Sequence, residues 1–211
     1  MDEEKKISQA VIKRLPRYYR YLGYLLNNGV VKTSSKELSR LMDITASQVR
    51  QDLNNFGCFG QQGYGYDVKS LYLEMKKILG LNKIHTMIVI GCGNLGNAIG
   101  NYPNFEKIGF EIIGLFDNKP SRIGKKIRDV YIQDIEKLNL FLKHREVDVA
   151  VLTVPRDSAE DMGKILANYN IKGIWNFSNV ELQLDNTGII IENTQITDNL
   201  MTLAYKMKDT Q

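Results

Sequence analysis

The sequence predicts an α/β protein in which a small helical domain precedes a doubly wound, parallel sheet. Three observations predict this arrangement. Residues 8–79 show the spacing of amphipathic helices, short β-branched runs recur from residue 86 onward, and helical segments lie between most of those runs. Strands that alternate with helices form βαβ units, whose strands pair in parallel. We place the boundary near residues 81–83, with one domain over 1–80 and the other over 81–211.

The composition is typical of a chain that buries a core. Hydrophobic residues make up 43% of the 211 residues, an ordinary share for a globular protein. No apolar run approaches the roughly 20 residues of a membrane helix, and the mixed charges of residues 1–6 do not resemble a secretion signal. Cys58 and Cys92 are expected to be two unrelated thiols, although a single redox pair between them stays open. We therefore expect a cytoplasmic protein that contacts no membrane.

Positive charge is concentrated in the N-terminal domain. The net charge of the chain is +4, yet residues 1–80 hold 13 basic and 8 acidic residues, whereas residues 81–211 hold 15 and 16. Basic charge attracts phosphates and releases their counterions. The asymmetry favours a polyanionic partner for the first domain, although many solvated surfaces carry a similar charge.

The first two helices are indicated by apolar spacing and by capping residues. Apolar side chains at spacings of three and four indicate a helix over residues 8–28. Ser34 or Ser35 can then cap a second helix, because a serine hydroxyl accepts from the free N–H groups of a first turn. Residues 42–44 form the turn to the next helix.

A third helix completes a helix-turn-helix, and glycines follow it. Thr45 caps this helix and Gln48 completes a capping box, so that the helix runs to about Phe56. Glycine tolerates the positive φ angles of tight hairpins, and the next segment is unusually rich in it. These glycines predict a winged helix-turn-helix; they are Gly57, Gly60, Gly63 and Gly65. An amphipathic helix over residues 68–79 ends the domain.

The third helix is the predicted recognition helix, with its N-terminal turns in the major groove of DNA. Val49 and Leu53 pack inward, and Arg50 can bridge a phosphate or read guanine. The polar side chains on the outer side are Ser47, Gln48, Arg50 and Gln51. A helical bundle unrelated to DNA is the alternative. Asp52 gives that alternative some support, because an acid near the groove would repel phosphates.

The second domain is predicted from its β-branched runs. The expected strands cover residues 86–90, 110–116, 147–154, 173–177 and 188–192. The last helix, about residues 198–207, has a wide apolar face that needs a large surface to cover it. Its own domain or a partner subunit can supply that surface, by docking or by swapping.

A glycine-rich turn follows the first of these strands. Gly91 permits the tight turn, Gly93 lets the backbone approach a pyrophosphate, and Gly96 allows the following helix to pack closely on the sheet. The N–H groups at the start of that helix would then face the phosphates. The context predicts a Rossmann-type dinucleotide site. The alternative is a doubly wound domain whose glycines are purely structural.

An acid at the end of the second strand points to the cofactor. Asp117 lies 21 residues beyond Gly96, close to the spacing of the acid that binds the adenosine ribose. Its charge would repel a 2′-phosphate, which favours NAD(H) over NADP(H). Lys119 weakens that preference, because a cation so near can meet a phosphate.

The residues of a hydride-transfer enzyme are not evident. His85 and His144 are not placed for proton transfer, and Tyr102 has no lysine four residues later to lower its pKa. No metal-ligand cluster appears, and we expect no metal. We therefore expect the nucleotide to be a ligand and the protein not to be an enzyme. An NAD-dependent oxidoreductase with an accessory helical domain and a nucleotide-binding scaffold without DNA affinity are the alternatives.

Motifs along nearly the whole chain resemble the Rex family of bacterial redox-sensing transcriptional repressors. The matching segments are Arg14-Leu15-Pro16, Tyr18-Tyr19-Arg20-Tyr21-Leu22, Ser34-Ser35-Lys36-Glu37-Leu38, Gln48-Val49-Arg50-Gln51-Asp52-Leu53, Phe56-Gly57, Gly63-Tyr64-Gly65-Tyr66, Gly91-Cys92-Gly93-Asn94-Leu95-Gly96, Phe116-Asp117, Leu152-Thr153-Val154-Pro155 and Asn176-Phe177. The resemblance implies a homodimer whose last helix is exchanged between subunits. It also implies binding to palindromic operators of fermentation and anaerobic respiration genes, release from double-stranded DNA by NADH, and binding with NAD⁺.

The resemblance also implies roles for individual residues. The expected cofactor contacts are Gly91, Gly93, Asn94, Leu95, Gly96, Tyr102, Asp117, Val154, Pro155 and Asn176, with Ile196 of the partner subunit near the nicotinamide. The expected DNA contacts are Arg14, Ser47, Gln48, Arg50, Gln51, Gln62 and Tyr64. Arg20 and Gln195 would couple the nicotinamide pocket to the DNA domain.

Several positions depart from the family pattern. Gln51 and the Gln61-Gln62 pair stand where the family commonly has basic residues, so we expect a shallower salt dependence of DNA binding. Gln195 stands where some relatives have an acidic residue, which can form an ion pair with the arginine that corresponds to Arg20. Glutamine cannot form that ion pair. Lys119 stands where many relatives have an acid.

Overall fold

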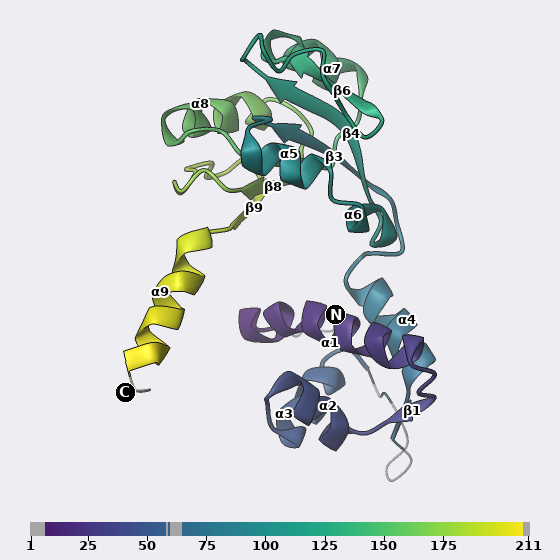
Figure 1. The fold of residues 1–211 in the computed structure, drawn as a ribbon. Helices are drawn as coiled ribbons and strands as arrows, with labels where there is room; N and C mark the ends of the chain where they lie inside the picture. The colour runs from purple at the N-terminus through teal and green to yellow at the C-terminus, as the bar shows by residue number, and fades with distance from the viewer. Residues whose placement is uncertain (1–6, 58, 60–64, 209–211) are drawn as a thin grey trace. The chain divides into compact units, whose positions relative to one another are not determined.

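The computed structural model describes residues 7–57, 59 and 65–208, which form two compact units (Figure 1). The units are Met1–Lys83 and Ile84–Gln211, and their division falls beside the boundary expected near residues 81–83. The segment expected to form the wing lies largely outside the described residues. The same holds for Cys58 and for the predicted DNA contacts Gln62 and Tyr64.

The described residues of the N-terminal unit form four helices and one short pair of strands. The helices are α1 (Gln9–Asn27), α2 (Ser35–Met42), α3 (Ala46–Asn54) and α4 (Val68–Ile78). Strand β1 (Lys32–Thr33) pairs antiparallel with β2 (Tyr66–Asp67). The buried side chains come from all four helices and include Tyr18, Leu22, Leu38, Met42, Val49, Leu53, Leu71 and Met75. The four helices expected from the sequence are therefore present, with α4 packed against α1.

Capping residues define the helix starts as the sequence predicts, with one exception. Ser34 and Glu37 form a reciprocal capping box at α2. At α3 the Thr45 hydroxyl accepts from the Gln48 N–H at 3.1 Å, but the Gln48 side chain donates to Asp52. The expected capping box is therefore only half formed, because the Gln48 side chain turns toward the Asp52 carboxylate instead of accepting from the Thr45 N–H.

The C-terminal unit is a seven-stranded sheet in the order β5-β6-β4-β3-β7-β8-β9. Six strands run parallel: β3 (His85–Ile90), β4 (Phe110–Asp117), β6 (Val130–Asp134), β7 (Val149–Leu152), β8 (Gly173–Asn176) and β9 (Ile190–Asn193). The expected parallel sheet is confirmed over these six strands, and at one edge β5 (Lys126–Ile127) adds an antiparallel pair with β6. Neither strand was expected, because both are short and polar residues interrupt them.

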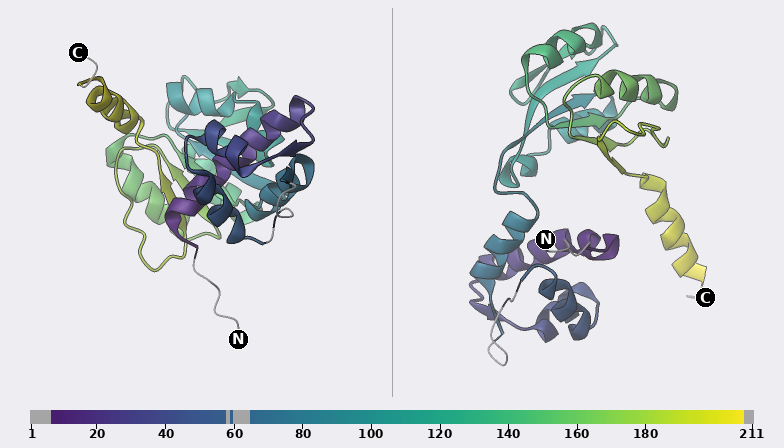
Figure 2. Two further views of the ribbon diagram at one scale, coloured as in Figure 1. Left: turned by 90° about the horizontal axis from the view of Figure 1, so that it is seen from below. Right: turned by 180° about the vertical axis from the view of Figure 1, so that it is seen from behind.

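Helices cover both faces of this sheet (Figures 1 and 2). They are α5 (Asn94–Gly100), α6 (Asn104–Lys107), α7 (Leu138–His144) and α8 (Arg156–Ala167), with a 3₁₀ turn at Ile135–Lys137. Helices α7 and α8 pack on the side of Ile88 and Phe116, and α5 packs on the side of Met87 and Val89. The chain leaves the central strand β3 for β4 on one side and later adds β7 on the other. Ligands bind at the carboxyl ends of strands at such a switch point.

The last helix, α9 (Ile196–Met207), has no buried residue. Its exposed apolar side chains are Ile196, Leu200, Met201, Leu203, Tyr205 and Met207. Within the C-terminal unit, therefore, the wide apolar face expected from the sequence is left uncovered.

Candidate functional site

The glycine-rich turn connects the carboxyl end of β3 to the start of α5. Gly91 has a φ of 92°, and a Cβ there would lie 2.7 Å from the carbonyl oxygen of Thr153. A Cβ on Gly96 would overlap the carbonyl oxygen of Gly91. At Gly93 the nearest atoms to such a Cβ belong to Arg122, at 3.7 Å. Gly91 and Gly96 are thus required by the fold, whereas Gly93 leaves open space at the mouth of the turn.

A cavity of about 590 Å³ opens in front of this turn, a size within the range of small-molecule sites. It brings together five of the expected cofactor residues: Gly91, Gly93, Asp117, Val154 and Pro155. Val154 and Pro155 follow β7, so that the carboxyl ends of β3, β4 and β7 all meet at this cavity. That position is where an open α/β sheet binds a dinucleotide.

Asp117 lines the cavity, and three donors hold its carboxylate in place. Its carboxylate accepts from the N–H of Cys92 at 2.7 Å, from the N–H of Lys119 at 2.8 Å and from the Arg122 guanidinium at 3.0 Å. Burial by itself would raise the pKa of Asp117, but these three hydrogen bonds outweigh it and lower the pKa. Asp117 is therefore an ionised acceptor in a fixed position, as the expected ribose contact requires.

Arg122 is a site residue that sequence reasoning did not find. It pairs with Asp117 and lies beside Gly93, so the cavity contains a cation next to the expected pyrophosphate position. It comes from the loop between β4 and β5, where no periodic pattern marks its direction. With Lys119 it adds positive charge to the end of the cavity that is expected to hold the adenosine.

Five expected cofactor residues of this chain do not line the cavity. Three of them, Asn94, Leu95 and Gly96, form the first turn of α5, and two lie elsewhere. Asn176 is buried. Its side-chain NH₂ donates hydrogen bonds to the Val180 carbonyl and to Asn193, and its side-chain oxygen accepts one from the Ser178 hydroxyl. It fixes the end of β8, and its role as a direct cofactor contact stays a prediction. Tyr102 is 48% exposed and makes an edge contact with a neighbouring aromatic ring, that of Phe105.

The outer face of α3 is polar and partly hollowed. The residues around the hollow are Ser47, Arg50, Gln51, Asn54 and Asn55. The Arg50 guanidinium donates to the Ser35 hydroxyl at 3.1 Å, which ties the side chain to the start of α2. Three of the expected DNA contacts thus share one surface. Asn54 and Asn55 join them at the end of the helix, which the expectation for the first turns did not include.

Asp52 lies on the inner face of α3 and is fully buried. Arg14 from α1 binds it in bidentate fashion at 2.6 and 2.8 Å, and Tyr18 and Gln48 donate to it at 3.0 and 2.7 Å. The expectation that Asp52 would face the groove and repel phosphates is therefore wrong. Its three-residue spacing from the buried Val49 places it on the inner side of the helix.

The same network engages two of the expected DNA contacts. The Arg14 guanidinium forms an ion pair with Asp52, and the Gln48 amide donates a hydrogen bond to the same carboxylate. Their contact with DNA stays a prediction. In this structure Arg14 holds α3 against α1, whereas the Gln48 bond lies within α3. Burial alone would raise the pKa of Asp52, but the hydrogen bonds from Arg14, Gln48 and Tyr18 outweigh it and lower the pKa.

The lowered pKa makes the stability of the N-terminal unit depend on pH. The charge of Asp52 stabilises the fold above its unfolded pKa of about 3.9, and this contribution is lost as pH falls through the lower folded value. We expect wild type to melt above Asp52→Asn at neutral pH, with the difference shrinking below about pH 4. Thermal melts followed by circular dichroism measure this. A constant difference from about pH 7 to about pH 3 contradicts the prediction.

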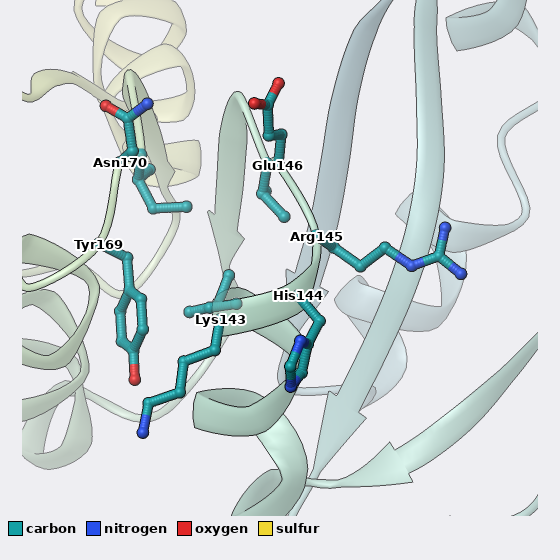
Figure 3. Close-up of a pocket in the computed structure, with 9 residues that line it drawn as sticks. Lys143, His144, Arg145, Glu146, Tyr169 and Asn170 are labelled. Carbon is teal, nitrogen blue, oxygen red and sulfur yellow. The ribbon is translucent and has the colours of Figure 1, made fainter.

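A second hollow and the Cys92 thiol are not among the cofactor and DNA contacts described above. A hollow of about 300 Å³ lies at the amino ends of β7 and β8, with Lys143, His144 and Tyr169 around it (Figure 3). It is at the opposite edge of the sheet from the glycine turn. Cys92 is a free, buried thiol, and burial raises its pKa to about 11. Among the described residues, no cluster of side chains is suited to a metal and no helix could cross a membrane.

The fold and the two surfaces define a class of protein, namely a helix-turn-helix DNA-binding regulator with a dinucleotide site in its second domain. Residues 6–54 match the family model described as "Putative DNA-binding protein N-terminus", and residues 82–180 match the CoA binding domain model. The redox-sensing transcriptional repressor Rex of Caldicellulosiruptor bescii is 51% identical over 99% of this chain and 96% of its own length. The Rex protein of Clostridium tetani is also 51% identical, over 99% of both chains.

Solved structures agree with these relatives. The crystal structure of RSP in complex with β-NAD⁺ and operator DNA has a TM-score of 0.91 and 49% identity, over 97% of this chain and 94% of RSP. RSP in complex with β-NADH has a TM-score of 0.90 and 46% identity, over 98% and 96%. The chain belongs to the Rex family of redox-sensing transcriptional repressors. The alternative of an oxidoreductase finds no support, since these relatives are named as repressors.

Proposed function

We propose that the protein is a homodimeric repressor that occupies a palindromic operator with NAD⁺ or without cofactor and leaves it when NADH binds. The observation that carries the proposal is the cavity at the glycine turn, which Asp117 and Gly93 both line. In the proposal, Asp117 binds a ribose and Gly93 faces a pyrophosphate. The α3 face, with Arg50 at its centre, is the surface offered to DNA. Such a repressor works where bacterial DNA lies, in the cytoplasm.

The apolar face of α9 supports the homodimer. Six large apolar side chains of this helix are exposed, more than a lone soluble chain usually leaves in one place. A second copy of the chain can cover them symmetrically, by exchange of the helix. Ile196, at the first turn of α9, would then reach the nicotinamide end of the partner's site.

The two cofactors differ in a property that the site can read. The nicotinamide ring of NAD⁺ is positively charged and that of NADH is not, so an apolar and aromatic pocket favours NADH. A ligand shifts a conformational equilibrium only through such differential affinity. The shift we propose changes the distance between two α3 helices, which must lie about 34–36 Å apart to enter successive major grooves.

Titration of operator binding against each cofactor tests this function. The full chain is bound to a palindromic operator at fixed salt, and NADH or NAD⁺ is added. We expect NADH to weaken binding and NAD⁺ to leave it intact or strengthen it. Equal effects of the two cofactors overturn the sensor proposal, and a monomer at the concentrations used overturns the homodimer.

Arg50→Ala is expected to weaken operator binding by about 1–3 kcal/mol per half-site, because the residue supplies a guanidinium at the centre of the α3 surface. NADH affinity should not change, since Arg50 lies in the other unit. The matched control is Arg128→Ala, which removes an arginine paired with Glu106 in the C-terminal unit. Gel shifts measure both variants. Normal operator binding by Arg50→Ala would mean that the recognition surface is misplaced.

A further inference from the structure

A chain of aromatic rings runs across one face of the C-terminal sheet. Tyr102 meets Phe105 edge-on with ring centroids 4.9 Å apart, Phe105 meets Trp175 at 5.9 Å, and Trp175 meets Phe177 at 4.7 Å. Trp175 and Phe177 come from β8 and the residue after it, whereas Phe105 belongs to α6. Rings packed in this way move together, because each fills the space beside the next.

The Trp175 indole connects this chain of rings to the segment that begins α9. Its Nε1–H donates to the Thr194 hydroxyl at 2.8 Å. The Thr194 N–H in turn donates to the Asn176 carbonyl at 2.8 Å, and the Asn176 amide donates to Asn193 at 2.8 Å. Gln195, the next residue, is the N-cap of α9. The direction in which α9 leaves the sheet is therefore set by Thr194 and by the residues that hold it.

We propose that Trp175 and Thr194 are positioning residues that transmit the occupancy of the nicotinamide end to α9. The proposal rests on the proposed function, in which α9 joins the two subunits, together with the expectation that Tyr102 contacts the cofactor at its nicotinamide end. An indole N–H donates in one direction only, so a rotation of the ring strains or breaks its bond to Thr194. A ring shift that begins at Tyr102 thus becomes a change in the start of α9.

The inference is tested with variants that differ by one atom group. Thr194→Val removes the hydroxyl and keeps the shape of the side chain, whereas Thr194→Ser keeps the hydroxyl. Thr187→Val is the matched control, because that hydroxyl donates to the Leu184 carbonyl in the loop before β9. For each full-length variant, operator affinity is measured with and without NADH, NADH affinity is measured alone, and the oligomeric state is determined.

We expect Thr194→Val to bind NADH within about twofold of wild type. The factor by which NADH weakens operator binding should be smaller in this variant than in wild type by at least about fivefold, a typical coupling factor. Thr194→Ser and Thr187→Val should respond as wild type does. A full response by Thr194→Val, or its dissociation into monomers, overturns the inference. If NADH does not change the operator affinity of the wild type, the proposed function is wrong instead. The two failures are therefore distinguishable.

Discussion

Arg14→Met is expected to destabilise the N-terminal unit by about 3–5 kcal/mol, the cost of leaving a buried charge without its partner. The carboxylate that loses its partner is Asp52, which is fully buried and receives two of its four hydrogen bonds from Arg14. The recognition helix α3 would also lose the ion pair that holds it on α1. Operator affinity should therefore fall, although the Arg14 guanidinium binds Asp52 and not DNA in this structure. Amide hydrogen exchange in residues 9–27 and 46–54 measures the loss of stability where it arises.

The double variant Arg14→Met with Asp52→Leu is the control. It replaces the ion pair with apolar groups of similar size, which is often neutral or stabilising. We expect it to recover most of the stability lost by the single variant, and to recover operator binding only as far as the packing of α3 on α1 is restored. A loss below about 1 kcal/mol in the single variant would show that Asp52 is not buried as a charge in solution.

Elements of the fold that depend on local chemistry were predictable from the sequence. The capping serine at Ser34, the glycine turn at residues 91–96 and the parallel strands on either side of it each carry their own signal. Strand β5, at the edge of the sheet, and β6 beside it carry little signal, because β5 has only two residues and polar side chains interrupt β6.

The site was predictable where it follows a strand end and unpredictable where a loop folds back. Gly91, Asp117 and Val154 meet because parallel strands end at one edge of the sheet. Arg122 joins them through a loop whose path no sequence pattern specifies. Asp52 was misjudged for a different reason. Its acidic side chain suggested an exposed position, although its spacing on α3 pointed inward toward Arg14.

Gly93→Ala is expected to abolish most NADH binding while the protein folds normally. A Cβ on Gly93 would meet only the Arg122 guanidinium, at an ordinary contact distance of 3.7 Å, and its φ of −68° suits alanine. The methyl group would, however, stand where the backbone must approach a pyrophosphate. We expect a loss of affinity of at least about tenfold, or 1.4 kcal/mol, measured by energy transfer from Trp175, the single tryptophan of the chain, to bound NADH.

Gly96→Ala is the opposite case and separates a structural glycine from a ligand-facing one. Its Cβ would overlap the Gly91 carbonyl oxygen and press on the Thr153 hydroxyl at 2.7 Å, and overpacking of this kind costs about 1–3 kcal/mol or more. The C-terminal unit should therefore melt earlier, as the fluorescence of Trp175 reports, even without cofactor. If Gly93→Ala were the variant that melts early and Gly96→Ala the one that melts normally, the turn would not have the geometry that a dinucleotide requires.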